Sequence, residues 1–184
     1  TILTQYLLSA WQKAGKLKGK EFVVKTIVTT ELITEMCKKY GVEMFDVLTG
    51  FTYIGEKIRL LEGKKQYIGG GEESYGYLAG DFVRDKDAVI ACSLVAEAAA
   101  VAKNEGKSLY DVLVDTYVEY GMYKESLCSI EKEGKAGKEA IKAMMDNFRA
   151  NPPKELNGSP VAYIKDYGQS ITTDCKKEKK KKID

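Results

Sequence analysis

Apolar residues follow two patterns that alternate along the first 106 residues. In one pattern they are spaced three or four apart, as on one face of a helix. In the other they form short runs rich in β-branched and aromatic residues, as in a buried strand. The expected elements, in chain order, are a helix over 2–13, a strand over 21–28, a helix between Thr30 and Gly41, a strand over 44–48, a helix over 54–61, a strand over 66–68 and a helix over 87–105. This alternation predicts a mostly parallel sheet covered on both faces, which is a three-layer α/β domain.

The pattern changes after residue 106. Ser108 and Asp111 form a capping pair for a helix that is expected to stop at Gly121. Beyond it, the expected elements are a strand over 123–130, a helix over 135–149 and a strand starting over 161–164, followed by a polar, lysine-rich remainder. This β-α-β segment has too few strands to close a core, so we expect the incomplete start of an α+β domain.

These patterns predict three parts of the chain. We expect an α/β domain over 1–107, a linker helix over 108–121 and the truncated start of a second domain over 122–184. The chain begins at Thr1, without an initiator Met and almost directly in a helical pattern. We therefore expect it to be a piece of a longer protein.

Composition excludes several kinds of chemistry. The chain has no histidine, which removes imidazole as a metal ligand, as a general base and as the partner of a Ser or Cys nucleophile. The formal net charge is +2, but the last nine residues alone carry +4, so residues 1–175 carry −2. A nucleic-acid-binding surface is therefore not expected. The lysine run over 176–182 has no interleaved aromatic residues, which favours a solvated loop over a surface that binds nucleic acid or an anionic membrane.

The cysteines and the apolar runs bear on metal binding and on location. No CxxC motif occurs, and without histidine a zinc site would need all four cysteines, so no metal site is expected. We interpret the four as reduced thiols of a cytoplasmic protein, with a disulfide pair as the alternative: Cys37, Cys92, Cys128 and Cys175. The most apolar run, over 88–102, is short and contains Ser93 and Glu97, so no membrane span is expected, and no signal peptide is visible.

Candidate chemistry lies in the loops after the predicted strands, because ligands of open parallel sheets bind beyond the carboxyl ends of the strands. Three such loops lie over 28–30, 48–51 and 69–77. In the third, three consecutive glycines leave the backbone free to approach a ligand closely and to adopt positive φ. Glu72, Glu73 and Ser74, next to these glycines, suit a polyhydroxylated ligand because one carboxylate can accept two sugar hydroxyls. The alternative is a glycine-rich hairpin with solvated glutamates.

A second candidate is the charged segment that precedes the long helix. Arg84 and Lys86 could hold an anionic group such as a phosphate, assisted by the helix N-terminus. Alternatively, Asp85 and Asp87 simply complement the helix dipole in its first turn. We expect the apolar residues nearby to pack rather than to bind a ligand: Tyr75, Tyr77, Phe82 and Val83.

Four segments of the chain together resemble the α-D-phosphohexomutase superfamily. The sequence GGEESYGY over 70–77, followed by GDFVRDKDAV over 80–89, is most similar to the phosphoglucomutase/phosphopentomutase-type branch, within the phosphoglucomutase/phosphomannomutase family. KTIVTTEL over 25–32 and LTGFTYIG over 48–55 occur in the order and at the spacing of the family. The resemblance covers roughly residues 1–167. Family members have four domains, and the resemblance implies that this chain covers the sugar-binding third domain and the first half of the fourth.

The resemblance implies roles for particular residues. Glu72 and Ser74 would bind sugar hydroxyls, Thr49 and Gly50 would lie in a loop that contacts substrate, and Lys86 would reach toward the reacting sugar phosphate. With Arg84 from the charged segment, the expected substrate-binding set is Glu72, Ser74, Thr49, Gly50, Lys86 and Arg84. No residue of this chain is expected to be catalytic, apart from an assisting role for Lys86. Two positions bear on the match, Thr52 where the family usually has Lys, and Tyr77 where some relatives have His.

The resemblance also implies what a longer parent protein does. It would be an isomerase that transfers a phosphoryl group between C1 and C6 of a hexose, or C1 and C5 of a pentose, through a phosphoserine and a bisphosphate intermediate. Mg²⁺ would be bound outside this chain, and a sugar bisphosphate would be the activator. The expected partners are a phosphosugar substrate and the remaining domains. The alternative is a stand-alone sugar-phosphate-binding or regulatory module without catalysis.

Overall fold

The computed structural model describes residues 1–126, 129–177 and 179–183. The chain divides into two compact units, over 1–126 and 127–184. The first unit contains, in chain order, α1 (Ile2–Lys13), β1 (Glu21–Thr26), α2 (Leu32–Tyr40), β2 (Glu43–Val47), α3 (Phe51–Leu61), β3 (Gln66–Gly71), β4 (Tyr77–Ala79), α4 (Ala88–Asn104) and α5 (Leu109–Tyr120). The expected alternation of helices and strands is confirmed, with β4 as an additional strand.

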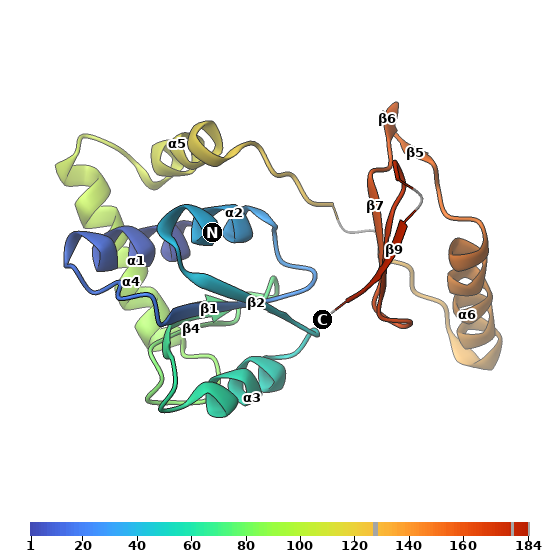
Figure 1. Cartoon of the computed structure of the whole chain (residues 1–184), viewed down its shortest axis with the longest axis horizontal. Coiled ribbons are helices and arrows are strands. Elements are labelled where there is room, and N and C mark those ends of the chain that lie inside the picture. Colours follow the sequence, from blue (N-terminus) through green and yellow to red (C-terminus); the bar gives the residue numbers. More distant parts are fainter. Residues whose placement is uncertain (127–128, 178, 184) are drawn as a thin grey trace. The chain divides into compact units, whose positions relative to one another are not determined.

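The sheet of the first unit has the strand order β2-β1-β3-β4 (Figure 1). β1 runs parallel to both of its neighbours, while β4 is antiparallel to β3. Every residue of β1 is buried, as the near-continuous apolar run of a central parallel strand predicts. The expected mostly parallel α/β sheet is therefore confirmed.

Helices cover both faces of this sheet, and each face has its own core. Val23 of β1 packs into a core that includes side chains of α1, α2 and α4. Its neighbours Phe22 and Val24 point to the opposite face, where they pack with α3. This alternation along one strand gives the three layers expected of the domain.

The three consecutive glycines do not belong to the loop that we expected from the sequence, but to the strand before it. Gly69, Gly70 and Gly71 extend β3, and none of them has a positive φ. A Cβ at Gly70 would lie 1.9 Å from the Val24 carbonyl oxygen, and one at Gly71 would lie 2.3 Å from the Gly76 carbonyl oxygen. The glycines therefore permit close approach of neighbouring backbone, and the expectation of positive φ is wrong for them.

Helix ends in the first unit follow the sequence signals. Gly41 adopts a left-handed conformation after α2, with φ of 66°. Asp87 accepts hydrogen bonds from the N–H groups of Val89 and Ile90, which caps α4. Ser108 and Asp111 form a complete capping box at the start of α5. α5 contacts α1, α2 and α4, so the helix expected as a linker packs within the first unit.

The second unit combines a helix with short antiparallel strands. Its elements are α6 (Gly134–Ala150), β5 (Glu155–Leu156), β6 (Ser159–Pro160), β7 (Tyr163–Asp166), β8 (Ile171–Asp174) and β9 (Lys179–Lys182). β5 pairs with β6, and a separate sheet has the order β7-β8-β9. Helix and strand mix as expected of an α+β domain, but more strands are present than the sequence predicted.

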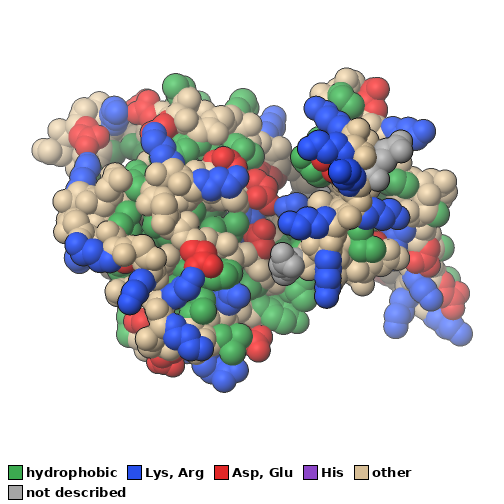
Figure 2. Space-filling model, viewed as in Figure 1, with side chains coloured by type: hydrophobic (Ala, Val, Ile, Leu, Met, Phe, Trp, Pro, Cys, Tyr) green, Lys and Arg blue, Asp and Glu red, His purple; other side chains and the backbone are tan. Residues whose placement is uncertain are grey.

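Two differences from expectation lie in or before this unit. No strand is present over 123–126 or 129–130, although one was expected over 123–130; residues 127 and 128 lie outside the described part. The lysine run was expected to be a solvated loop, but Lys179–Lys182 pairs with β8 as an edge strand. Backbone pairing does not depend on apolar side chains, and lysine is a common residue on exposed edges. Lysine and arginine side chains are conspicuous around β9 in Figure 2.

None of the helices that the structure describes is both long and apolar enough to cross a membrane.

Candidate functional site

Three loops leave the sheet at the edge where its parallel strands end. β1, β2 and β3 end at Thr26, Val47 and Gly71, and the register pairs Thr26 with Val47 and Lys25 with Gly71. The loops over 27–31, 48–50 and 72–76 therefore emerge side by side. These are the three loops that the sequence indicated, and the sheet brings them together as expected.

The loop between β3 and β4 is a tight hairpin. The N–H of Glu72 donates to the Gly76 carbonyl at 2.9 Å, directly beyond the paired residues Gly71 and Tyr77. The Glu72 carboxylate lies over Gly76, where a Cβ would come within 2.7 Å of its Oε1 atom. Ser74 is exposed near the tip of the hairpin. The hairpin thus presents Ser74 to solvent, with the Glu72 carboxylate held over its base.

The aromatic residues near this hairpin do not all pack as expected. Tyr75 is fully exposed and has a positive φ of 66°, which is uncommon for a residue with a side chain. Phe82 is 67% exposed. The packing interpretation is therefore wrong for these two residues and for Val83, which is also exposed. Tyr77 packs against the core on the α1 and α2 face, and burial raises the pKa of its hydroxyl.

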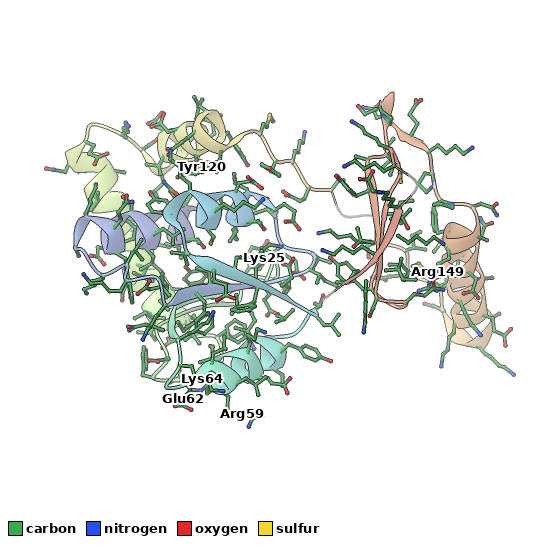
Figure 3. The ribbon with its side chains drawn as sticks, viewed as in Figure 1. Lys25, Arg59, Glu62, Lys64, Tyr120 and Arg149 are labelled. Atoms are coloured by element: carbon green, nitrogen blue, oxygen red, sulfur yellow. The ribbon has the colours of Figure 1, made fainter. Side chains whose placement is uncertain are left out.

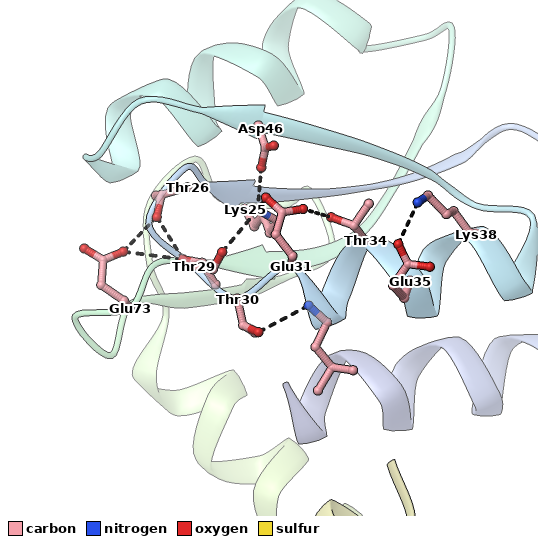
Figure 4. Close-up of polar contacts among 11 residues, drawn as sticks. Lys25, Thr26, Thr29, Thr30, Glu31, Thr34, Glu35, Lys38, Asp46 and Glu73 are labelled. Atoms are coloured by element: carbon pink, nitrogen blue, oxygen red, sulfur yellow. Dashed lines mark hydrogen bonds and ion pairs between the residues drawn. The ribbon is translucent and has the colours of Figure 1, made fainter. Parts of the chain in front are cut away.

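Glu73, unlike Glu72, points into the neighbouring loop. Its Oε2 atom accepts a hydrogen bond from the Thr26 hydroxyl at 2.7 Å and lies 3.4 Å from the Thr29 hydroxyl (Figure 4). Glu73 is exposed, as the alternative of solvated glutamates expects, but its carboxylate also accepts a hydrogen bond from a neighbouring strand end. No local pattern indicated this contact, since Thr26 and Glu73 are 47 positions apart.

Lys25 is a fully buried lysine beneath these loops. Its Nζ atom lies 2.6 Å from Asp46 Oδ1 and 3.5 Å from Glu31 Oε1, and it donates to the Thr29 carbonyl at 3.2 Å. Figure 4 shows this arrangement between β1, β2 and the start of α2. Lys25 was not among the expected site residues, although it begins the KTIVTTEL segment. The sequence did offer one sign of an unusual residue, because Lys25 follows three apolar residues within the strand sequence EFVVKT.

Cys37 of α2, whose thiol is influenced by the charge of Lys25, is unreactive. Burial raises the pKa of Cys37 to about 12, although the positive charge of Lys25 acts in the opposite direction. Its thiol therefore stays protonated at neutral pH, which makes it a poor nucleophile. Cys37, Cys92 and Cys175 are free, as expected; Cys128 lies outside the described residues.

The two cations before α4 have different partners. Arg84 pairs through Nη2 with Glu62 at 2.8 Å, and its Nη1 donates to the Asp81 carbonyl. Glu62 lies at the end of α3 (Figure 3). Lys86 Nζ lies 3.2 Å from Asp85 Oδ1, and hydrogen bonds from Lys86 lower the pKa of that carboxyl.

The loop between β2 and α3 lies close to Lys86. The Lys86 ammonium is 5.8 Å from the ring centre of Phe51, the first residue of α3. Gly50 precedes that helix with a φ of 125°, and Thr49 is exposed beside it. The structure thus brings Lys86 close to the loop that contains Thr49 and Gly50, while Arg84 is directed toward Glu62.

Within residues 1–126, 129–177 and 179–183, no group of three or more Cys, Asp or Glu side chains is arranged to hold a metal ion. The Mg²⁺ that the resemblance implies would be bound outside this chain, and no step is assigned to the described residues through it.

Comparisons with known proteins decide the family. Residues 1–120 match the family described as phosphoglucomutase/phosphomannomutase, alpha/beta/alpha domain III. The chain belongs to this family. The match ends at the last residue of α5, so the domain III region covers every helix and strand of the first unit. The expected resemblance is confirmed.

Curated relatives of this chain are phosphoglucomutases. The Staphylococcus haemolyticus protein (strain JCSC1435) is 37% identical over 166 residues, which is 90% of this chain and 30% of the relative. The Staphylococcus aureus protein (strain MRSA252) is 38% identical over 173 residues, which is 94% of this chain and 31% of the relative. This chain therefore spans about 30% of the length of these relatives.

Solved structures of similar fold come from the same family. The open form of pp63/parafusin, a phosphoglucomutase from Paramecium, matches with a TM-score of 0.60 and 16% identity, over 98% of this chain and 30% of that one. A putative phosphomannomutase from Thermus thermophilus matches with a TM-score of 0.51 and 20% identity, over 66% of this chain and 26% of that one. At these identities the likeness shows the shared fold.

Proposed function

We propose that this chain is the sugar-recognition segment of a phosphosugar mutase of the phosphoglucomutase/phosphomannomutase/phosphopentomutase type. The observation that carries the proposal is the hairpin over 72–76, which presents Ser74 to solvent at the sheet edge where domain III ligands are expected. Family membership and curated phosphoglucomutase relatives support the same assignment.

In this proposal the hairpin recognises the sugar ring. The Glu72 carboxylate accepts hydrogen bonds from two sugar hydroxyls at once, because an ionised carboxylate offers two oxygens side by side. The Ser74 hydroxyl adds a donor or an acceptor from the tip of the same hairpin. The negative charge of the Glu72 carboxylate attracts sugar hydroxyls and repels the phosphate. The sugar is therefore oriented with its hydroxyls toward the hairpin and its phosphate away from it.

The phosphate of the same ligand would lie near the β2–α3 loop. Lys86 carries a positive charge on a side chain that is 54% exposed and lies close to the first residue of α3. Thr49 and Gly50 offer hydroxyl and backbone donors there. Both cations would exchange a carboxylate partner for the phosphate, Arg84 its Glu62 and Lys86 its Asp85, and we propose that Lys86 makes the first contact because it lies near the start of α3.

The affinity of this segment alone should be weak. Two or three hydrogen bonds to a charged group contribute roughly 1–3 kcal/mol each. Association costs at least about 4 kcal/mol in lost freedom of motion, and an open hairpin excludes little water. The dissociation constant for a glucose phosphate should therefore be near or above about 1 mM.

Titration with glucose 6-phosphate tests this proposal. Amide shifts of Glu72, Ser74 and Lys86, followed by NMR, should saturate only at millimolar ligand, and Glu72→Ala should abolish them. The matched control is Glu105→Ala, which removes an exposed glutamate after α4 and should leave the shifts intact. Shifts confined to Lys179–Lys182 would show that the recognition lies elsewhere.

The chemical step itself would need other parts of a longer protein. We propose that a phosphoserine, a bound Mg²⁺ and a sugar bisphosphate activator complete the reaction there, through a bisphosphate intermediate. Positioning of a sugar without a phosphoryl carrier cannot move a phosphoryl group. This 184-residue chain should therefore show no conversion of glucose 1-phosphate above the buffer rate in a coupled assay with the bisphosphate present. Measurable turnover would contradict the division of roles.

A further inference from the structure

The contacts of Glu73 form a directed chain of hydrogen bonds. Thr26 and Thr29 hydroxyl oxygens are 2.8 Å apart, and the Thr26 oxygen is 2.7 Å from Glu73 Oε2. A carboxylate only accepts, so the short contact requires Thr26 to donate to Glu73. Thr26 has a single hydroxyl proton, so in the 2.8 Å contact it must accept from Thr29. The order is thus Thr29 to Thr26 to Glu73.

Lys25 fixes the position of Thr29, the donor at the start of this series of hydrogen bonds. The Thr29 carbonyl accepts a hydrogen bond from the buried Lys25 ammonium, which is itself held between Asp46 of β2 and Glu31 before α2. Thr26 is fully buried and belongs to the central strand β1. Glu73 therefore bonds to the buried end of β1, directly before the loop over 27–31 (Figure 4).

The adjacent glutamates of the hairpin have different surroundings. Glu72 lies over Gly76 within the hairpin and makes no hydrogen bond to another loop among those recorded for the described residues. Glu73 makes the contact that joins the hairpin to Thr26, the last residue of β1. The tip of the hairpin also contains Tyr75 at positive φ, a conformation that persists where the surroundings determine it.

We propose that Glu73 is a positioning residue that holds the sugar-recognition hairpin in place. Resting on the proposed function, its carboxylate ties the hairpin to Thr26 and thereby fixes Glu72 and Ser74 before a sugar arrives. Glu72 contacts the ligand, and Glu73 acts only through the hairpin. Affinity gains because the loop is ordered in advance, so less freedom is lost on binding.

The first experiment measures hairpin order without ligand. In the full 184-residue chain, ¹⁵N relaxation should show order parameters over 72–76 that fall in Glu73→Ala and partly recover in Glu73→Gln, which keeps an acceptor oxygen. The matched control, Glu72→Ala, should leave the order parameters unchanged. The Thr26 hydroxyl proton should be protected from exchange in the wild type and lose its protection in Glu73→Ala. Equal order in wild type and Glu73→Ala would overturn the proposal.

The second experiment is a double-mutant cycle on binding. Glu73→Ala and Thr26→Val should each raise the dissociation constant for glucose 6-phosphate about fivefold, the equivalent of one net hydrogen bond. The double variant should be no weaker than the weaker single variant, because both remove the same link. Effects that multiply would overturn the proposal. Thr29→Val, which lies outside the strand, should raise the dissociation constant by a smaller factor. It replaces Thr26→Val in the cycle if that variant does not fold.

The two experiments separate this proposal from the one on which it rests. If the wild-type chain does not bind glucose 6-phosphate, the proposed function fails, yet the relaxation experiment still decides whether Glu73 orders the hairpin. If binding occurs but Glu73→Ala changes neither order nor affinity, the proposed function stands and the positioning role is wrong. Urea midpoints of all variants establish that any loss is not a loss of fold.

Discussion

Among single residues, Lys25 has the surroundings least typical of its type. Its side chain is fully buried, while its partners Asp46 and Glu31 are 29% and 43% exposed. The two sides of this ion pair therefore differ in their access to water. A carboxylate left alone can be hydrated, whereas a lysine left alone in the sheet cannot, which makes the effect of removing each partner unequal.

This inequality gives a prediction for two substitutions. Lys25→Met should reduce the free energy of unfolding by about 1–2 kcal/mol, because the carboxylates regain water. Asp46→Asn should reduce it by more, about 2–4 kcal/mol, because a neutral amide then replaces the carboxylate that lies nearest to the buried ammonium. Urea denaturation of both variants measures the difference. If Lys25→Met lost more unfolding free energy than Asp46→Asn, the cost of an unpaired buried ammonium would not be the dominant effect.

Gly70 gives a second prediction at this scale. Gly70→Ala places a Cβ 1.9 Å from the Val24 carbonyl oxygen, and backbone cannot move aside as a side chain can. We expect a loss of about 3 kcal/mol or more in the free energy of unfolding. Gly106→Ala is the control, since its Cβ meets no atom and only the φ of 73° is unfavourable, at about 1–2 kcal/mol. Equal losses would mean that β1 and β3 separate easily.

Residues that act through local sequence were the predictable ones. Ser108 and Asp111 identified a helix start because a capping box spans four adjacent positions. Lys25 and Glu73 could not be assigned, because their partners come from strands and loops that only the fold brings together. The glycines before the hairpin were misjudged for the same reason. A run of glycine permits a loop or a close backbone approach, and only the strand pairing decides which.

Among the elements, the turn before β1 has a pH dependence of its own. Burial alone would raise the pKa of Glu21, but the N–H groups of Lys18, Gly19 and Lys20 donate to its carboxylate and lower it below 4.5. A folded-state pKa below the unfolded value means that the contribution is complete above 4.5 and is lost as pH falls through the folded value.

Glu21→Gln should therefore flatten part of the acid response. Between about pH 5 and pH 3 the urea midpoint of the wild type should fall more steeply than that of the variant, because only the wild type takes up a proton at this site. At about pH 7 the variant should be the less stable of the two, since a neutral amide accepts weaker hydrogen bonds than a carboxylate. Parallel midpoint curves would show that Glu21 does not contribute to acid unfolding.

The long helices and central strands were predictable because their apolar periodicity is set by burial on one or two faces. β1 and α3 are buried in the pattern that their sequences indicate. β4 has three residues, too few for a period-2 pattern to be distinguished, and β9 has only lysine. Neither carries the apolar signal on which strand prediction depends.

At the scale of the whole molecule, the two units differ in how much apolar surface they bury. The buried hydrophobic residues among the described ones all belong to the first unit. On α6 of the second unit, Met145 and Phe148 are 44% and 50% exposed. Units with unequal cores are expected to unfold separately, the weaker one first.

The single tryptophan allows this to be measured. Trp11 lies in α1, so its fluorescence reports on the first unit. In urea, amide protons of α6 should exchange before the Trp11 signal changes, and without urea they should exchange faster than those of β1 and β3. Coincident transitions and uniform protection would contradict the division into two units of unequal stability.

The four lysines of β9 place positive charge along an open sheet edge, which opposes pairing with another strand of the same charge. β9 is the outer strand of the order β7-β8-β9, so one side of its backbone is unpaired within its sheet. Two copies that met along this edge would bring eight ammonium groups together, and repulsion would oppose their pairing. Screening removes this repulsion, since charges interact over only about 3 Å at 1 M salt. The tendency of this protein to self-associate should consequently rise with ionic strength, opposite to the behaviour of a protein that associates through ion pairs.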